Sequence, residues 1–164
     1  MVARGLRSAR LLAGPEATVS ATVSHLRGAS VFHFSGHALS SSHRTGLLLS
    51  DGLLTTASLS RQNLAQMQLA VFSACDTQSG SSGGVGDPDS LVRTFLRAGV
   101  PHVVASRWNV DSTATRFFME EFYRALLNGM SVAESVRQAQ SNLRARPGMA
   151  HPYFWAAFAA FGLV

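Results

Sequence analysis

The stretch "VFHFSGHALS", residues 31–40, decides the fold, because an apolar run ends there in two histidines and a glycine. A second apolar run, "LAVFSAC" at residues 69–75, ends in Cys75, the only cysteine of the chain. Short, continuously apolar runs of this kind are typical of strands buried in a parallel sheet. Ligands and reactive side chains gather beyond the carboxyl ends of such strands. His37 and Cys75 are therefore predicted to lie at neighbouring strand ends.

Segments of helical periodicity alternate with these apolar runs. Pro15 and Glu16 suit the first turn of a helix that Gly28 would end. Ser131 and Glu134 form a capping box at the start of another helix. From such signals we expect helices near residues 15–28, 58–67, 89–99, 112–128 and 131–144.

Further strands are predicted between these helices. The Asp-Gly pair at residues 51–52 separates two apolar runs and indicates a hairpin over residues 46–55. We also expect strands in "SARLLAG" (8–14), "VPHVVASRW" (100–108) and "YFWAAFAAFGLV" (153–164). The alternation of strands and helices predicts an α/β fold with a mostly parallel sheet covered by helices on both faces.

Composition narrows the class of protein. At 164 residues, of which 46% are hydrophobic, the chain is long enough for one domain with a substantial core. The net charge of +5 comes from 14 arginines that are scattered rather than interleaved with aromatic residues, which disfavours a nucleic-acid partner. Apolar stretches stay short of the roughly 20 residues of a membrane span. A single cysteine forms no internal disulfide, so we expect a reducing, cytoplasmic location.

Cys75 is the candidate nucleophile, because a thiol at the mouth of a sheet can be exposed, activated by a base and surrounded by oxyanion donors. The alternative is a buried structural cysteine, which packs like a small hydrophobic residue. His37 follows Gly36 and can project over the strand ends as a base. His33 falls within the strand pattern and is expected to be a hydrogen-bonded core residue or one that contacts and supports the catalytic residues. The other histidines lack the clustered partners of a metal site: His25, His43, His102 and His151.

The glycine-rich segment "GSSGGVGD", residues 80–87, lacks the Gly-Lys-Ser/Thr ending of a P-loop and the spacing of a dinucleotide fingerprint. It is predicted to be a loop beside the site, closing on Asp87 and Pro88 as the cap and first turn of a helix. The segment "FSACDTQSG" contains no Gly-x-Ser-x-Gly elbow, which disfavours a serine hydrolase.

Five blocks together resemble a known family. They are "VFHFSGHA", "LAVFSACDTQSG", "FLRAGVPHVVASRWNVDSTAT", "FFMEEFYRALLNGMSVAESVRQAQSNLR" and "HPYFWAAFAAFG". In this order and spacing they resemble the CHAT domain, a caspase-like cysteine peptidase domain related to separases and often joined to tetratricopeptide repeats. The resemblance covers residues 8–164.

The resemblance implies a caspase-like three-layer sandwich in which His37 is the catalytic histidine and Cys75 the nucleophile. It also implies an oxyanion site shaped by Gly36 and by the backbone N–H groups of Ala38 and Cys75. Family members usually carry glycine where this chain has Ala38, so that site depends on a backbone conformation that suits a Cβ. From the resemblance we expect a first strand and helix before "ARLLAG" that residues 1–164 do not contain. We therefore expect residues 1–164 to be one CHAT domain that is N-terminally trimmed or a fragment of a larger protein.

The function implied is a cysteine endopeptidase without a cofactor or metal, acting on protein or peptide substrates and gated by a tetratricopeptide-repeat or other regulatory partner. The alternative is a catalytically silent caspase-like interaction module; neither involves nucleic acid or membrane. Trp108 and Asp111 are expected to form the wall and floor of a pocket for a basic P1 side chain, with Asp76 as a rival acid. Asp111 stands directly before a predicted helix, so a capping role is the competing interpretation.

Overall fold

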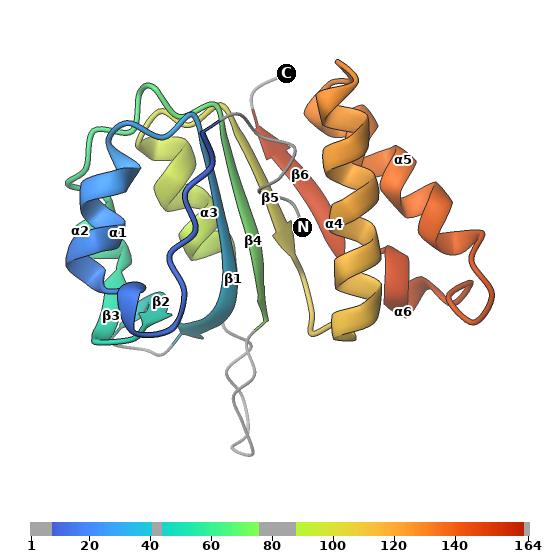
Figure 1. The fold of residues 1–164 in the computed structure, drawn as a ribbon, viewed down its shortest axis with the longest axis horizontal. Helices are drawn as coiled ribbons and strands as arrows, with labels where there is room; N and C mark the ends of the chain where they lie inside the picture. The colour runs from blue at the N-terminus through green and yellow to red at the C-terminus, as the bar shows by residue number, and fades with distance from the viewer. Residues whose placement is uncertain (1–7, 41–43, 76–87, 163–164) are drawn as a thin grey trace.

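The computed structural model describes residues 8–40, 44–75 and 88–162. Within them, six strands form one sheet in the order β3-β2-β1-β4-β5-β6 (Figure 1). The central strands β1, β4 and β5 run parallel, and their carboxyl ends lie at the same edge of the sheet. The strands are β1 Val31–Ser40, β2 Thr45–Leu49, β3 Gly52–Thr55, β4 Leu69–Cys75, β5 His102–Ser106 and β6 Phe158–Gly162.

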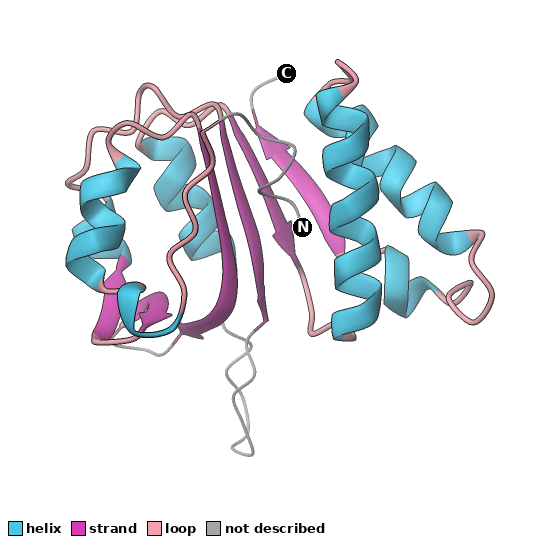
Figure 2. Ribbon diagram, viewed as in Figure 1, coloured by secondary structure: helices cyan, strands magenta, loops and turns pink. Residues whose placement is uncertain are grey.

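Helices cover both faces of this sheet, as the sequence predicts (Figure 2). One layer contains α1 (Val19–Leu26), α2 (Thr56–Leu59) and α3 (Pro88–Arg97), and the other contains α4 (Ser112–Leu127), α5 (Val132–Arg144) and α6 (Pro152–Trp155). The result is a three-layer α/β arrangement. None of the helices in the described part of the chain is both long enough and apolar enough to cross a membrane.

The prediction of a mostly parallel sheet holds only for the centre. Strands β2, β3 and β6 each pair antiparallel with their neighbours. The direction of a strand depends on how its connection returns to the sheet, and short apolar runs carry no signal of direction. The hairpin of β2 and β3 was predicted correctly, although its two loop residues are Ser50 and Asp51, and Gly52 begins β3.

Two predicted strands are wrong in part or whole. Residues 8–13 form no strand, and the short 3₁₀ helix η2 (Gly14–Glu16) follows them. Leu11 is 74% exposed, so this leucine is not anchored in the core as a buried strand residue would be. The expected strand over 153–164 begins instead with α6. Its first residue is Pro152, and the side chain of His151 caps it by accepting from the Tyr153 N–H.

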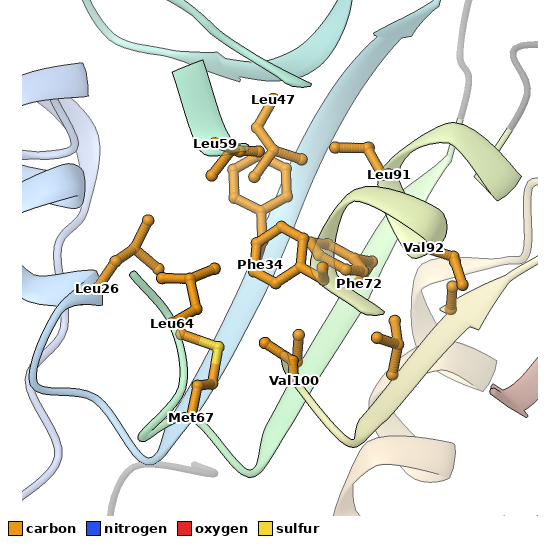
Figure 3. Packing of buried hydrophobic residues seen from close by; sticks show 14 of the residues in the cluster. Leu26, Phe34, Leu47, Leu59, Leu64, Met67, Phe72, Leu91, Val92 and Val100 are labelled. Carbon is orange, nitrogen blue, oxygen red and sulfur yellow. The ribbon is translucent and has the colours of Figure 1, made fainter. Parts of the chain in front are cut away.

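The core between the sheet and the α1–α3 layer is mostly aliphatic and includes the aromatic rings of Phe34 and Phe72 (Figure 3). The rings of Phe72 and Phe95 meet edge to face with centroids 5.0 Å apart, and Phe34 packs in the same cluster. On the opposite face of the sheet, Phe118 of α4 stacks on Phe158 of β6 at 4.2 Å. The sheet is therefore fixed from both sides, and its strand ends project from a rigid support.

The tip of the β2–β3 hairpin is tied to the start of α1. The Asp51 carboxylate accepts a hydrogen bond from the Val19 N–H at 2.8 Å. The Ser50 N–H donates to the Ala17 carbonyl at 3.0 Å, and the Ser50 hydroxyl donates to the Pro15 carbonyl. The hairpin and α1 are thus held together although Asp51 and Val19 are 32 positions apart.

Strand β1 changes its paired neighbour near its carboxyl end. Its residues from Val31 to His37 pair with β4, and its residues from Ala38 to Ser40 pair with β2. His37 is therefore the last residue of the parallel pairing, and the residue after it belongs to the antiparallel pairing.

Candidate active site

His37 and Cys75 are register partners. His37 is paired with Cys75, the last residue of β4, across the parallel ladder of β1 and β4. Neighbouring strands lie about 4.8 Å apart, so the two backbones are adjacent. For Cys75 the structure describes the backbone position alone, whereas the His37 side chain is described and exposed. The sequence-based prediction of a strand-end position is confirmed for Cys75, the last residue of β4. His37 lies within β1, which continues to Ser40, although the two residues are paired in the register.

The alternation of β1 assigns His37 to the face of the sheet that carries α4. Phe32 and Phe34 pack toward the α1–α3 layer. Val31 packs with the α4 cluster, and His33 contacts Tyr123 of α4. Because successive strand residues point to opposite faces, His37 lies on the face of Val31 and His33. The imidazole is exposed on this face.

His33 is held by two hydroxyl groups. Its Nδ1 atom lies 2.9 Å from the Tyr123 hydroxyl, and its Nε2 atom lies 3.2 Å from the Ser73 hydroxyl. The imidazole also stacks on the Tyr123 ring, with centroids 5.6 Å apart. Burial lowers the pKa of His33 from 6.5 to about 4 and raises the pKa of Tyr123 above its usual value. His33 is therefore neutral near pH 7 and serves as the hydrogen-bonded structural residue that the sequence predicted.

The partners of His33 were not found by sequence reasoning. A signal existed in Tyr123, which falls on the apolar face of α4 and is buried there. A buried tyrosine hydroxyl normally finds a hydrogen-bond partner, so this residue predicts a polar group opposite it. Because His33 and Tyr123 are 90 positions apart in the chain, the sequence alone did not identify His33 as this polar group.

Gly36 and Ala38 flank the histidine along β1. A Cβ added to Gly36 would lie 2.9 Å from Cζ of Phe34, so the ring of Phe34 occupies the space that a side chain would need. Ala38 pairs with Leu47 of β2 and packs against the α1–α3 side of the core. Among the described non-glycine residues, Ser8 alone has a positive φ, so the backbone at Ala38 tolerates its Cβ.

The structure places the predicted pocket residues just beyond β5. The Asp111 carboxylate caps α4 by accepting from the N–H groups of Thr113 at 2.8 Å and Ala114 at 3.0 Å. The Trp108 indole donates to the Tyr153 carbonyl at 3.0 Å, and the residue is 37% exposed. The capping interpretation of Asp111 is confirmed. Asp76, and with it the loop predicted over residues 80–87, lies outside the described residues.

Metal-ligating side chains are dispersed in the described ranges. No group of three or more His, Cys, Asp or Glu residues there could hold a metal ion. What the site offers on the described residues is an exposed imidazole on β1 and, on the neighbouring strand β4, the backbone of a cysteine at the paired position.

Two curated proteins share part of this sequence. Tetratricopeptide repeat protein 28 of Mus musculus is 32% identical over 107 residues, which are 63% of this chain and 4% of that protein. Tetratricopeptide repeat protein 28 of Homo sapiens is 34% identical over 73 residues, 44% of this chain and 3% of that protein. The chain therefore spans only a few per cent of the length of these relatives. The family model of the CHAT domain matches residues 1–163, nearly the whole chain. The chain belongs to the CHAT domain family.

Proposed function

We propose that the chain is a cysteine endopeptidase that cleaves protein substrates through a dyad of Cys75 and His37. The observation that carries the proposal is the register pairing of these two residues at the last position of the ladder between the parallel strands β1 and β4. A cysteine peptidase needs a thiolate and a base within hydrogen-bond reach, and neighbouring strand ends bring two side chains to that distance when they share a face. Membership in the CHAT family and the three-layer fold agree with a caspase-like site.

The shared face follows from strand alternation. Leu69 and Val71 of β4 pack on the α4 side, and Ser73 reaches His33 on the same side. We take Cys75 to continue this row, since it stands two residues after Ser73. The proposal requires the thiol and the imidazole of His37 to meet on that face.

The reaction divides into acylation and deacylation. The Cys75 thiolate attacks the carbonyl carbon of the scissile peptide bond, and backbone N–H groups near Cys75 and along Gly36–Ala38 stabilise the oxyanion. His37, which has accepted the thiol proton, donates it to the leaving amine. Water then attacks the thioester with His37 as base, and the carboxylic acid product leaves with the thiol regenerated.

We assign the role of the base to His37 rather than to His33. Its lowered pKa makes it a poor proton acceptor at neutral pH, and both of its nitrogens are already hydrogen-bonded. The side chain of His37, four residues later, is exposed.

We place the substrate along the end of the sheet, with Trp108 and Asp111 as the wall and floor of the P1 pocket and Asp76 as the rival acid. An acid there would favour a basic P1 side chain. Because both relatives are named as tetratricopeptide repeat proteins, we propose that a repeat segment or another partner gates the site. The single cysteine fits a reducing, cytoplasmic compartment.

The test is incubation of the chain with a peptide library and identification of cleaved bonds by mass spectrometry. The chain, Cys75→Ala and His37→Ala are compared, with His25→Ala as the control for an exposed histidine on α1. Cleavage by the chain and His25→Ala that disappears in the other two variants supports the dyad. Cleavage that persists in Cys75→Ala refutes it. Absence of cleavage by the chain alone, and also with an added tetratricopeptide-repeat segment, would favour the silent interaction module.

A further inference from the structure

Three arginines gather around two aromatic rings where α4, α5 and α6 meet. The guanidinium carbon of Arg146 lies 3.4 Å from the centroid of Phe117, and that of Arg116 lies 5.0 Å from the same ring. The guanidinium carbon of Arg144 lies 5.7 Å from the ring of Trp155. All three arginines are exposed. We call these five residues the arginine–aromatic patch.

Within the described residues, the three guanidiniums of the patch form no hydrogen bond and no ion pair. This separates them from Arg124 on the same α4 helix, which forms an ion pair with Glu121. Two like charges that share one ring repel each other, and within the described residues neither guanidinium forms an ion pair with a carboxylate. Binding an anion between Arg116 and Arg146 would relieve it.

The rings also prepare the guanidiniums for binding. A guanidinium that lies over an aromatic face keeps its N–H edges free, and stacking restricts the long side chain before any ligand arrives. The planar set of N–H donors matches a carboxylate group, which it can bind through two parallel hydrogen bonds. Because the arginine side chains are already ordered, less conformational entropy is lost when a ligand binds.

We propose that the arginine–aromatic patch binds an acidic segment of a partner protein, with Asp or Glu carboxylates received by Arg116 and Arg146. The net charge of +5 attracts such a segment at long range. Nucleic acid fits less well, because single strands bind by stacking bases on open aromatic faces and Arg146 covers a face of Phe117. This surface is distinct from the dyad and does not depend on catalysis.

The patch lies at the end of the molecule where the carboxyl ends of the parallel strands also lie. Arg116 lies in the second turn of α4, the helix that begins at the carboxyl-end edge of the sheet (Figure 1). Helix α6, which carries Trp155, lies at the same end of the molecule. An acidic segment bound there would run past the end of the sheet that carries His37.

The test measures binding rather than cleavage. The probe is a fluorescein-labelled peptide of about 12 residues that alternates Glu and Ser, titrated with the full chain and followed by fluorescence anisotropy. The double variant Arg116→Gln/Arg146→Gln should weaken binding by about tenfold or more, which corresponds to the loss of roughly one charge-assisted contact. The control Arg61→Gln/Arg97→Gln removes the same charge from the α1–α3 side and should change the dissociation constant less than about twofold.

Arg146→Lys separates geometry from charge, because lysine keeps the charge and loses the planar donors. It should weaken binding to an intermediate extent, with all variants showing the thermal unfolding of the parent. Equal weakening by the patch and control variants would overturn the proposal, as would no measurable binding. Tighter, patch-dependent binding of a labelled oligothymidylate would also overturn it and assign the surface to nucleic acid.

Discussion

His37 and Cys75 are paired across β1 and β4 at the last position of the parallel ladder. Because the two residues are paired, the rate at which the thiol of Cys75 reacts tests whether the imidazole of His37 interacts with it. An imidazole within hydrogen-bond reach stabilises the thiolate and lowers the pKa of a thiol, whereas a buried structural cysteine reacts slowly.

Alkylation of Cys75 by iodoacetamide near neutral pH should therefore be faster than alkylation of a free thiol, and the advantage should shrink in His37→Ala. Mass spectrometry of the intact chain over time gives the rate. His25→Ala controls for loss of an exposed imidazole elsewhere. Equal rates in His37→Ala and the parent would mean that the two side chains do not interact.

Asp111 can be tested as a cap and as a pocket acid with two substitutions. Asparagine caps helices about as well as aspartate, so Asp111→Asn should leave stability nearly unchanged, whereas Asp111→Ala should cost about 1 kcal/mol. If the carboxylate also selects a basic P1 residue, both variants should lose preference for Arg over Leu in matched peptides. Thermal unfolding and cleavage rates separate the two roles. Retained Arg preference in Asp111→Asn would limit the residue to capping.

The burial of His33 should make the protein less stable in mild acid. With a pKa of about 4 when folded and 6.5 when unfolded, the residue is neutral in both states above pH 6.5. Between these values the unfolded chain binds a proton that the folded chain does not. The free energy of unfolding should therefore fall as pH decreases from 6.5 to 4, by up to about 1.4 kcal/mol per pH unit, and no further below.

Urea unfolding at several pH values measures this slope. His33→Gln should have lower stability at pH 7 and a shallower slope, while His25→Gln should keep the slope of the parent. A slope that is the same in His33→Gln and the parent would show that other groups cause the acid sensitivity.

Asp51 should stabilise the protein through α1. Asp51→Ala removes the acceptor for the Val19 N–H and should lower the free energy of unfolding by about 0.5–2 kcal/mol. Asp51→Asn keeps an acceptor oxygen at the same place and should lose less. Urea denaturation of the three proteins checks the order. Equal losses in both variants would indicate that the charge, rather than the hydrogen bond, supports the helix.

The sequence alone predicted those structural features that depend on one local pattern of residues. Continuous apolar runs predicted β1 and β4, and the end of the second run predicted the position of Cys75 at the end of β4. Strand β1, in contrast, continues past His37 to Ser40. The capping box of Ser131 and Glu134 was also present as predicted. These features depend on residues that are close in the chain, so composition and spacing describe them well.

Features that depend on distant residues were not predictable in the same way. The contact of His33 with Tyr123 joins β1 to α4, and the bond from Val19 to Asp51 joins α1 to the hairpin. The prediction of a strand at "SARLLAG" was wrong because apolar residues alone do not show whether a sheet edge is available to pair with them. Strand direction was likewise decided by packing rather than by the strand sequence.

The change of partner along β1 couples the histidine to the folding of the hairpin. His37 is the last residue paired with β4, and the next residue, Ala38, is paired with Leu47 of β2. A local unfolding of β2 and β3 removes the neighbour that holds the chain directly after His37. The free energy of that opening, which is smaller than that of global unfolding, then sets how often the histidine leaves its strand position. Amide hydrogen exchange at Ala38 and Leu47 reports this fluctuation.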